Sequence, residues 1–290
     1  MMISIAFAFG FLGAFFGSFA GAQVWRLRAR QLVEDQAHGE KVSQKELVQL
    51  KKLIRPVSGD RSECLRCHHT LAWYDLVPIA SWVGLGGRCR YCKKPIGTTE
   101  LLVELALGIA FGLSYYFWPV ALDSAFAWTS FVLWLSACVL MTILFVYDAR
   151  WYLLPFAINL SLIGVGLAFA LVQLWGSGWE LSGIASLMLA LVFLAGLYYI
   201  FSLFGWVGLG DSILGVGLAL LLGTWQHSLL ALFLANLLGC LFLLPLALRG
   251  RLKRNMHIPF GPFLILGAVI AVLWGDKLIF ELFRFLNTSL

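Results

Sequence analysis

Two aspartates stand at the ends of apolar runs, where an ionisable side chain is costly. Asp148 closes one such run, and Asp211 opens another directly after Gly208 and Gly210. A carboxylate in or near lipid costs roughly 3 kcal/mol unless it faces protein or water. The glycines leave room for a backbone or a substrate beside Asp211 and permit a positive φ. Considered alone, Asp211 could equally cap the following helix.

Pairing the two aspartates would give a defined chemistry. Two neighbouring carboxylates cannot both ionise cheaply, so they share a proton. One then acts as a general base on water, and the protonated partner polarises the scissile carbonyl, as in aspartic proteases. Two alternatives stay open on this evidence. The residues could be unrelated cap or loop carboxylates, or a proton relay in a membrane transporter.

The cysteines suggest a metal site. One C-x-x-C pair lies at Cys64 and Cys67 and a second at Cys89 and Cys92, with 21 residues between the pairs. Each pair can bind a tetrahedral metal from one turn, so the pattern predicts one structural zinc ion held by all four thiols. Two disulfides are the alternative. Fourteen Lys and Arg residues between 25 and 100 mark this segment as cytoplasmic, where thiols stay reduced, which favours zinc.

The composition indicates a protein of the membrane. Of the 290 residues, 61% are hydrophobic and only 12% are charged, which no soluble domain could bury. We expect membrane lipid as a partner. The net charge of +6 is better explained by basic loops on one side of a bilayer than by binding to nucleic acid.

We predict an all-α polytopic membrane protein with about eight transmembrane helices and a small cytoplasmic zinc-binding module between spans 1 and 2. The first span covers residues 3–24 and lacks an A-x-A-like cleavage site, so we expect it to be retained. The other spans lie near residues 100–119, 125–147, 154–175, 181–204, 211–224, 227–248 and 259–275. The predicted parts are therefore 1–24 (first transmembrane helix), 25–99 (cytoplasmic region with the zinc module) and 100–290 (membrane-embedded domain).

Local patterns add detail to the first 54 residues. Gly13, Gly17 and Gly21 recur every four positions, which predicts that another helix packs closely against the first span. Residues 43–54 have the pattern of an amphipathic helix, with Ser43 and Glu46 spaced as a capping box.

The distribution of charge tests the predicted topology. If 25–99 is cytoplasmic, 19 of the 21 Lys and Arg residues fall on the cytoplasmic side. In this topology Asp148 and Asp211 both lie at the cytoplasmic edge of the membrane, which favours the aspartate pair.

Several blocks of sequence follow one another in a specific order. They are Gly17-Ser18-Phe19 with Arg26, the two C-x-x-C pairs, Pro78-Ile79-Ala80-Ser81-Trp82, Gly87-Arg88-Cys89-Arg90-Tyr91-Cys92, Glu104, Asp148 with Leu154-Pro155, Gly208-Leu209-Gly210-Asp211, and Ile258-Pro259-Phe260-Gly261-Pro262. On these blocks the chain resembles the type IV prepilin peptidases of the GxGD class of intramembrane aspartic proteases. The resemblance runs nearly end to end.

The chain also departs from the family pattern at four positions. Gly21 and Ala22 stand where the family usually has Asn and Val, Phe156 where it has a second Asp, and Ile213 where it has Lys. None of these changes removes a catalytic carboxylate. They weaken any claim about exact substrate preference.

The resemblance implies a function. Asp148 and Asp211 would be the catalytic pair, and Gly208 and Gly210 the active-site loop. The enzyme would remove the basic leader of type IV prepilins or pseudopilins at the cytoplasmic face of the bacterial inner membrane. Many members also methylate the new N-terminus with S-adenosylmethionine. The sequence shows no Rossmann-type glycine motif, so such an activity would involve the region of Gly87 and the zinc module.

Overall fold

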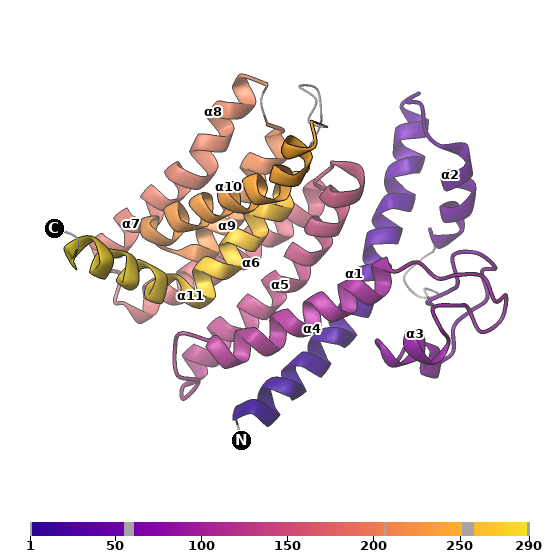
Figure 1. Ribbon diagram of the computed structural model, residues 1–290, viewed down its shortest axis with the longest axis horizontal. Coiled ribbons are helices and arrows are strands. Elements are labelled where there is room, and N and C mark those ends of the chain that lie inside the picture. The colour runs from indigo at the N-terminus through magenta and orange to yellow at the C-terminus, as the bar shows by residue number, and fades with distance from the viewer. Residues whose placement is uncertain (1, 55–60, 206, 251–257, 289–290) are drawn as a thin grey trace. The chain divides into compact units, whose positions relative to one another are not determined.

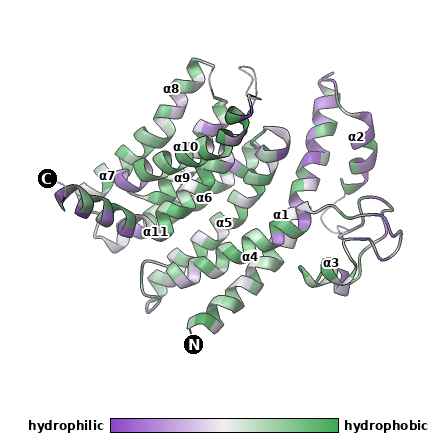
Figure 2. Cartoon of the chain, viewed as in Figure 1, coloured by the Kyte–Doolittle hydropathy of each residue, from purple (hydrophilic) through white to green (hydrophobic). Residues whose placement is uncertain are grey.

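The structure is a computed structural model that describes residues 2–54, 61–205, 207–250 and 258–288 (Figure 1). Within these ranges the chain is helical, and its only β-type pairings are two isolated bridges. Figure 2 shows that the long helices are predominantly hydrophobic. The absence of strands in the described part confirms the predicted all-α class.

Seven stretches of helix are long and apolar enough to cross a membrane. Their elements are α1 (Met2–Ala37), α4 (Thr99–Phe117), α5 (Ala125–Trp151), α6 (Phe156–Gly176), α7 (Leu181–Leu191) continued by the π-helical η4 (Val192–Gly196) and α8 (Leu197–Leu203), α10 (Trp225–Leu248) and α11 (Gly261–Thr288). The shorter apolar helix α9 (Leu209–Leu222) corresponds to 211–224, the sixth of the eight predicted spans, and is too short to count among these seven. The prediction of a multi-pass membrane protein is confirmed.

The chain forms two compact units, residues 1–116 and residues 117–290. In the first unit, α1 extends well beyond the predicted 3–24 and ends at Ala37. Its added turns bury Ala29 and Leu32 against the short helix α2 (Gln44–Leu50), which is followed by η1 (Lys51–Leu53). The predicted span stops at residue 24 because charged residues follow it. In the structure the packing against α2 allows the helix to continue to Ala37.

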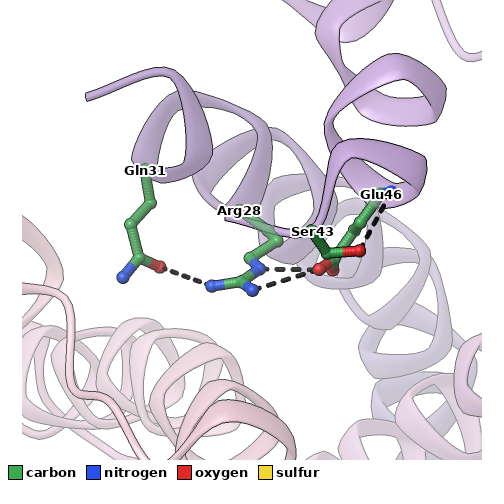
Figure 3. A network of polar contacts seen from close by, with 4 residues as sticks. All are labelled: Arg28, Gln31, Ser43 and Glu46. Carbon is green, nitrogen blue, oxygen red and sulfur yellow. Dashed lines mark hydrogen bonds and ion pairs between the residues drawn. The ribbon is translucent and has the colours of Figure 1, made fainter. Parts of the chain in front are cut away.

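A polar network joins α1 to α2 (Figure 3). Arg28 donates two hydrogen bonds to the Glu46 carboxylate, at 3.2 and 3.1 Å, and a third to Gln31. Ser43 accepts a hydrogen bond from the Glu46 N–H, as expected of a helix N-cap. The predicted capping box is thus only half formed, because the Glu46 side chain is engaged by Arg28.

Small residues bring α1 and α4 together in the first unit. A Cβ added to Gly13 would lie 2.5 Å from the Leu107 carbonyl oxygen, and one added to Gly17 would lie 2.6 Å from Cα of Glu104. The predicted close packing is confirmed at these two positions. It is wrong for Gly21, where an added Cβ would meet nothing within 4 Å.

In the second unit, α9 packs against α6, η4, α7, α8, α10 and α11. Nine of its fourteen residues are buried. Gly217 fits against Leu162 of α6, and Gly215 lies close to the backbone of Ala195 in η4. Ser212 fixes the same contact by donating its hydroxyl to the Ala195 carbonyl at 3.0 Å. These small side chains allow α9 to lie deep among its neighbours.

Candidate active site and metal centre

Asp148 lies in the last turn of α5 and is only 5% exposed. Its Oδ2 atom accepts a hydrogen bond of 3.0 Å from the N–H of Gly261, the first residue of α11. The first N–H groups of a helix have no partner within it. Asp148 therefore satisfies one of them, at the helix end whose dipole favours a negative charge.

Asp211 lies in the first turn of α9 and is half-buried. Its N–H donates to the carbonyl of Gly208 at 3.1 Å, which fixes the turn that leads into the helix. The Asp211 carboxylate interacts electrostatically with that of Asp148. A pair of like charges in one protein interior can hold a shared proton.

Leu154 connects the segments around these carboxylates. A Cβ added to Gly210 would lie 3.2 Å from Leu154 Cβ. One added to Gly261 would lie 2.7 Å from Asp148 Oδ2 and 3.6 Å from Leu154 Cδ2. The close packing around the two carboxylates thus involves Leu154 and the start of α11.

The expected reason for the two loop glycines is partly wrong. Neither Gly208 nor Gly210 has a positive φ, and Gly208 is extended with φ −72°. Gly210 is instead constrained by the side chain of Leu154. At Gly208 an added Cβ would reach Asp211 Oδ2 at 3.7 Å, an ordinary contact.

Sequence reasoning missed two members of this neighbourhood. Tyr198 of α8 is only 3% exposed and interacts electrostatically with Asp211. Its ring packs on Phe260, with the ring centroids 5.5 Å apart. The second missed group is the Gly261 N–H. The only sequence signal for Tyr198 is a tyrosine within an apolar run. The Gly261 N–H is a backbone group and gives no signal in the sequence.

The four predicted zinc ligands converge in the first unit. The Sγ atoms of Cys64, Cys67, Cys89 and Cys92 all lie within 4.8 Å of one another, and those of Cys64 and Cys92 are 4.0 Å apart. Zinc–sulfur bonds of about 2.3 Å in a tetrahedron place sulfurs ~3.8 Å apart, so the four thiols fit a metal ion. All four cysteines are free thiols, and the alternative of two disulfides is not supported.

The two C-x-x-C turns have the same backbone geometry. The Cys64 N–H donates to the carbonyl of His69, and the His68 N–H donates to the carbonyl of Cys64. The same two bonds recur at the second turn, among Cys89, Lys93 and Lys94. His68 and Lys93 both adopt left-handed conformations, with φ 56° and 57°. The chain therefore builds the cluster from two equivalent turns.

The thiols of the cluster differ in their acidity. Burial raises the pKa of the Cys64 thiol to about 12. Burial also acts on Cys89, but hydrogen bonds from the backbone N–H groups of Cys92 and Tyr91 outweigh it and lower the pKa of that thiol to about 7. A metal ion binds thiolates, so its binding would release protons from the cluster.

The residues between the second pair of cysteines are held by a short 3₁₀ helix, η3 (Trp73–Asp75). Asp75 accepts a hydrogen bond of 2.8 Å from Arg90 and one of 3.1 Å from Tyr91. Burial raises the pKa of Asp75, but these hydrogen bonds outweigh it and hold that pKa below its usual value. The carboxylate thus fastens the second turn to η3.

Gly87 opens the second turn next to the short helix α3 (Ala80–Gly84). It has a left-handed φ of 67°, and an added Cβ would lie 2.7 Å from the Trp82 ring. Its N–H donates to the Trp82 carbonyl, and its own carbonyl accepts from the Ile96 N–H, both at 2.8 Å. Local conformation and packing therefore account for glycine at this position.

A cavity of about 440 Å³ lies at the other end of the second unit. It is lined by Ser130 of α5 and by His227, whose ring contacts Asp276 at 3.3 Å. Ser130 precedes Asp148 by five turns of α5, or roughly 27 Å along the axis. The cavity is therefore separate from the aspartate site.

Family models match most of the chain. Residues 11–118 match the model of the bacterial peptidase A24 N-terminal domain. Residues 135–244 match the model of the type IV leader peptidase family, and this range holds both Asp148 and Asp211.

Curated relatives agree with these models. The prepilin leader peptidase/N-methyltransferase of Aeromonas hydrophila is 34% identical over 221 residues, which cover 75% of this chain and 73% of the relative. The protein of the same name from Burkholderia pseudomallei is 32% identical over 74% of this chain and 67% of the relative. A type 4 prepilin-like proteins leader peptide-processing enzyme of Escherichia coli is 29% identical over 90% of both chains.

No solved structure matches the chain. The two family models follow each other along the sequence in the order of the two compact units. The relatives carry names of one kind, and three quarters of this chain aligns with the first of them. The sequence resemblance is thereby confirmed, and the chain belongs to the type IV leader peptidase family.

Proposed function

We propose that this protein is an aspartic endopeptidase that removes the basic leader of type IV prepilins or pseudopilins. In this proposal the cut, the active site and the zinc module all lie at the cytoplasmic face of the bacterial inner membrane. The observation that carries this proposal is the packing around Leu154 in a chain of the type IV leader peptidase family. Leu154 lies against Gly210, next to Asp211, and against Gly261, whose N–H donates to Asp148. The relatives' names supply the class of substrate.

In this proposal the two aspartates divide the chemistry of peptide hydrolysis. One carboxylate removes a proton from a water molecule, and the other donates its proton to the scissile carbonyl oxygen. The hydrogen bond from Gly261 occupies Oδ2 of Asp148 and leaves Oδ1 for the water or the shared proton. Tyr198, buried beside Asp211, keeps that side of the pair dry.

We propose a structural role for the metal site. Zn²⁺ held by Cys64, Cys67, Cys89 and Cys92 would join the two equivalent turns into one module. A short segment with little core of its own gains folding free energy from such an ion.

The names of several relatives also include an N-methyltransferase activity, and we propose that this chain methylates the new N-terminus with S-adenosylmethionine. The surroundings of Gly87 do not fit a cradle for that molecule, because the Trp82 ring fills the space beside the glycine. We therefore assign no step of methyl transfer to Gly87. Substitution of Gly87 would disturb the metal module whether or not methyl transfer occurs.

The test is mass spectrometry of a prepilin co-expressed with the enzyme, which reports the cleavage site and any added methyl group together. Asp148→Asn and Asp211→Asn should each abolish cleavage while the protein still inserts and purifies normally. Asp123→Asn, at an exposed position of the second unit, is the matched control and should cleave like the parent. Full processing by either Asp148→Asn or Asp211→Asn would refute the proposed pair.

The proposal also separates the protein from a proton-coupled transporter, the alternative for which the comparisons give no support. A transporter would show a pH-driven flux that is lost in the same two variants and would leave the prepilin uncut.

A further inference from the structure

A buried amide on α6 lacks hydrogen-bond partners. Asn159 is only 1% exposed, and within the described part of the chain neither its Oδ1 nor its Nδ2 has a partner. Its backbone N–H donates to the carbonyl of Pro155 at 3.1 Å, so the residue is fixed in the first turn of the helix. The unmet groups are therefore those of the side chain alone.

Burying such an amide costs free energy that an apolar side chain of the same branched shape, such as leucine, would avoid. Buried polar groups in native proteins are almost always hydrogen-bonded, so each exception needs a cause. Leu162 and Phe169 share the buried face of α6 with Asn159. The position is thus suited to an apolar residue, and the chain has an amide there instead.

The position of Asn159 along the bundle connects it to the aspartate site. Leu154, just before α6, contacts Gly210 at the start of α9, and Leu162, further along α6, packs against Gly217. The two helices therefore run in the same direction. Asn159 lies between these two contacts, within about one turn, or ~5 Å, of Asp211 along the axis.

We propose that Asn159 positions the substrate by hydrogen bonding to one of its backbone peptide groups, on the membrane side of the scissile bond. This inference rests on the proposed peptidase function. A peptide must be extended at the cut, which leaves its N–H and C=O groups without helical partners. In surroundings without water those groups need partners from the protein. An asparagine amide offers both donors and an acceptor, so it can pair with either group or with both.

The inference predicts an unusual combination of effects for Asn159→Leu. The unfolding temperature of the substrate-free enzyme should be equal to that of the parent or higher, because the unmet amide is gone. The kcat/KM for a purified prepilin should fall at least tenfold, and Asn159→Thr, which keeps a donor and an acceptor, should retain part of the activity. Ser161→Ala, at an exposed position of the same helix, is the control and should leave both values unchanged.

A second measurement identifies the contact directly. Prepilin peptides are prepared, each with one backbone amide near the cut replaced by an ester, which removes an N–H. For the parent enzyme, one ester on the membrane side should lower kcat/KM, and Asn159→Leu should show little further loss with that peptide. Such non-additivity marks two groups that touch.

Three results are decisive. A lower unfolding temperature for Asn159→Leu with strictly additive ester effects would assign the amide an internal partner and overturn the inference. An unchanged kcat/KM would overturn it as well. If the parent itself leaves the prepilin uncut, the proposed function fails first, and this outcome is distinct from either of the others.

Discussion

Gly261→Ala tests whether the start of α11 holds in place the carboxylate of Asp148, which we propose to be catalytic. The added Cβ would lie 2.7 Å from Oδ2 and 3.4 Å from Cγ of Asp148, and Cβ atoms in real structures essentially never approach closer than 3.0 Å. Either the carboxylate rotates or the start of α11 shifts. In both cases the 3.0 Å hydrogen bond from the Gly261 N–H to Asp148 is lengthened or lost.

The expected effect follows from the strength of that hydrogen bond. A hydrogen bond to a charged group contributes about 1.5–3 kcal/mol. At about 1.4 kcal/mol per factor of ten, its loss from the reacting state lowers kcat/KM by about 10- to 150-fold. Both carboxylates remain in the protein, so the lower activity would result from the altered position of Asp148 relative to Asp211.

The assay is cleavage of a purified prepilin by the enzyme in nanodiscs, with thermal unfolding recorded on the same samples. Gly164→Ala is the matched control, because an added Cβ there meets nothing within 4 Å. Gly208→Ala, with an ordinary 3.7 Å contact to Asp211, should fall between the two. A kcat/KM for Gly261→Ala within threefold of the parent would refute the reasoning.

The remaining predictions concern packing and the metal. Gly210→Val should overpack the contact with Leu154, lower the free energy of unfolding by about 1–3 kcal/mol and impair cleavage. Adding Leu154→Ala to the same chain should restore much of the stability and of the cleavage, whereas unchanged stability in Gly210→Val would contradict this. The parent should contain one zinc per chain by elemental analysis and Cys64→Ser less, whereas a metal-free, freshly reduced parent would overturn the site. Leu50→Ala should destabilise the α1–α2 contact by about 2–5 kcal/mol and speed hydrogen exchange in α2. Val48→Ala, at a position that is 70% exposed, should not, and equal exchange rates in the two variants would argue against the packing.

Much of the helical framework could be predicted from the sequence, because lipid requires long apolar segments. The predicted span 181–204 is observed as Leu181–Leu203, and the predicted 227–248 as Trp225–Leu248. The convergence of the four cysteines could also be predicted from the sequence, because two short turns with fixed spacing leave few other arrangements. In these cases a local pattern determines the structure.

Other features could not be predicted, because they depend on contacts between distant segments. The extension of α1 to Ala37 follows from burial against α2, which hydropathy does not register. The bond from the Gly261 N–H to Asp148 joins residues 113 positions apart and uses a backbone donor that every non-proline residue has. The unmet amide of Asn159 is visible only when its neighbours are known.

The shortness of α9 has a consequence for the access of water. Fourteen residues rise about 21 Å, against a hydrocarbon core of about 30 Å. Because α9 lies among other helices of the protein, at least one of its ends must lie below the level of the headgroups. At such an end the neighbouring helices, and not the lipid, form the walls of any path for water. Asp211 lies in the first turn of this helix, so the side chains around that turn determine how readily water reaches its carboxylate.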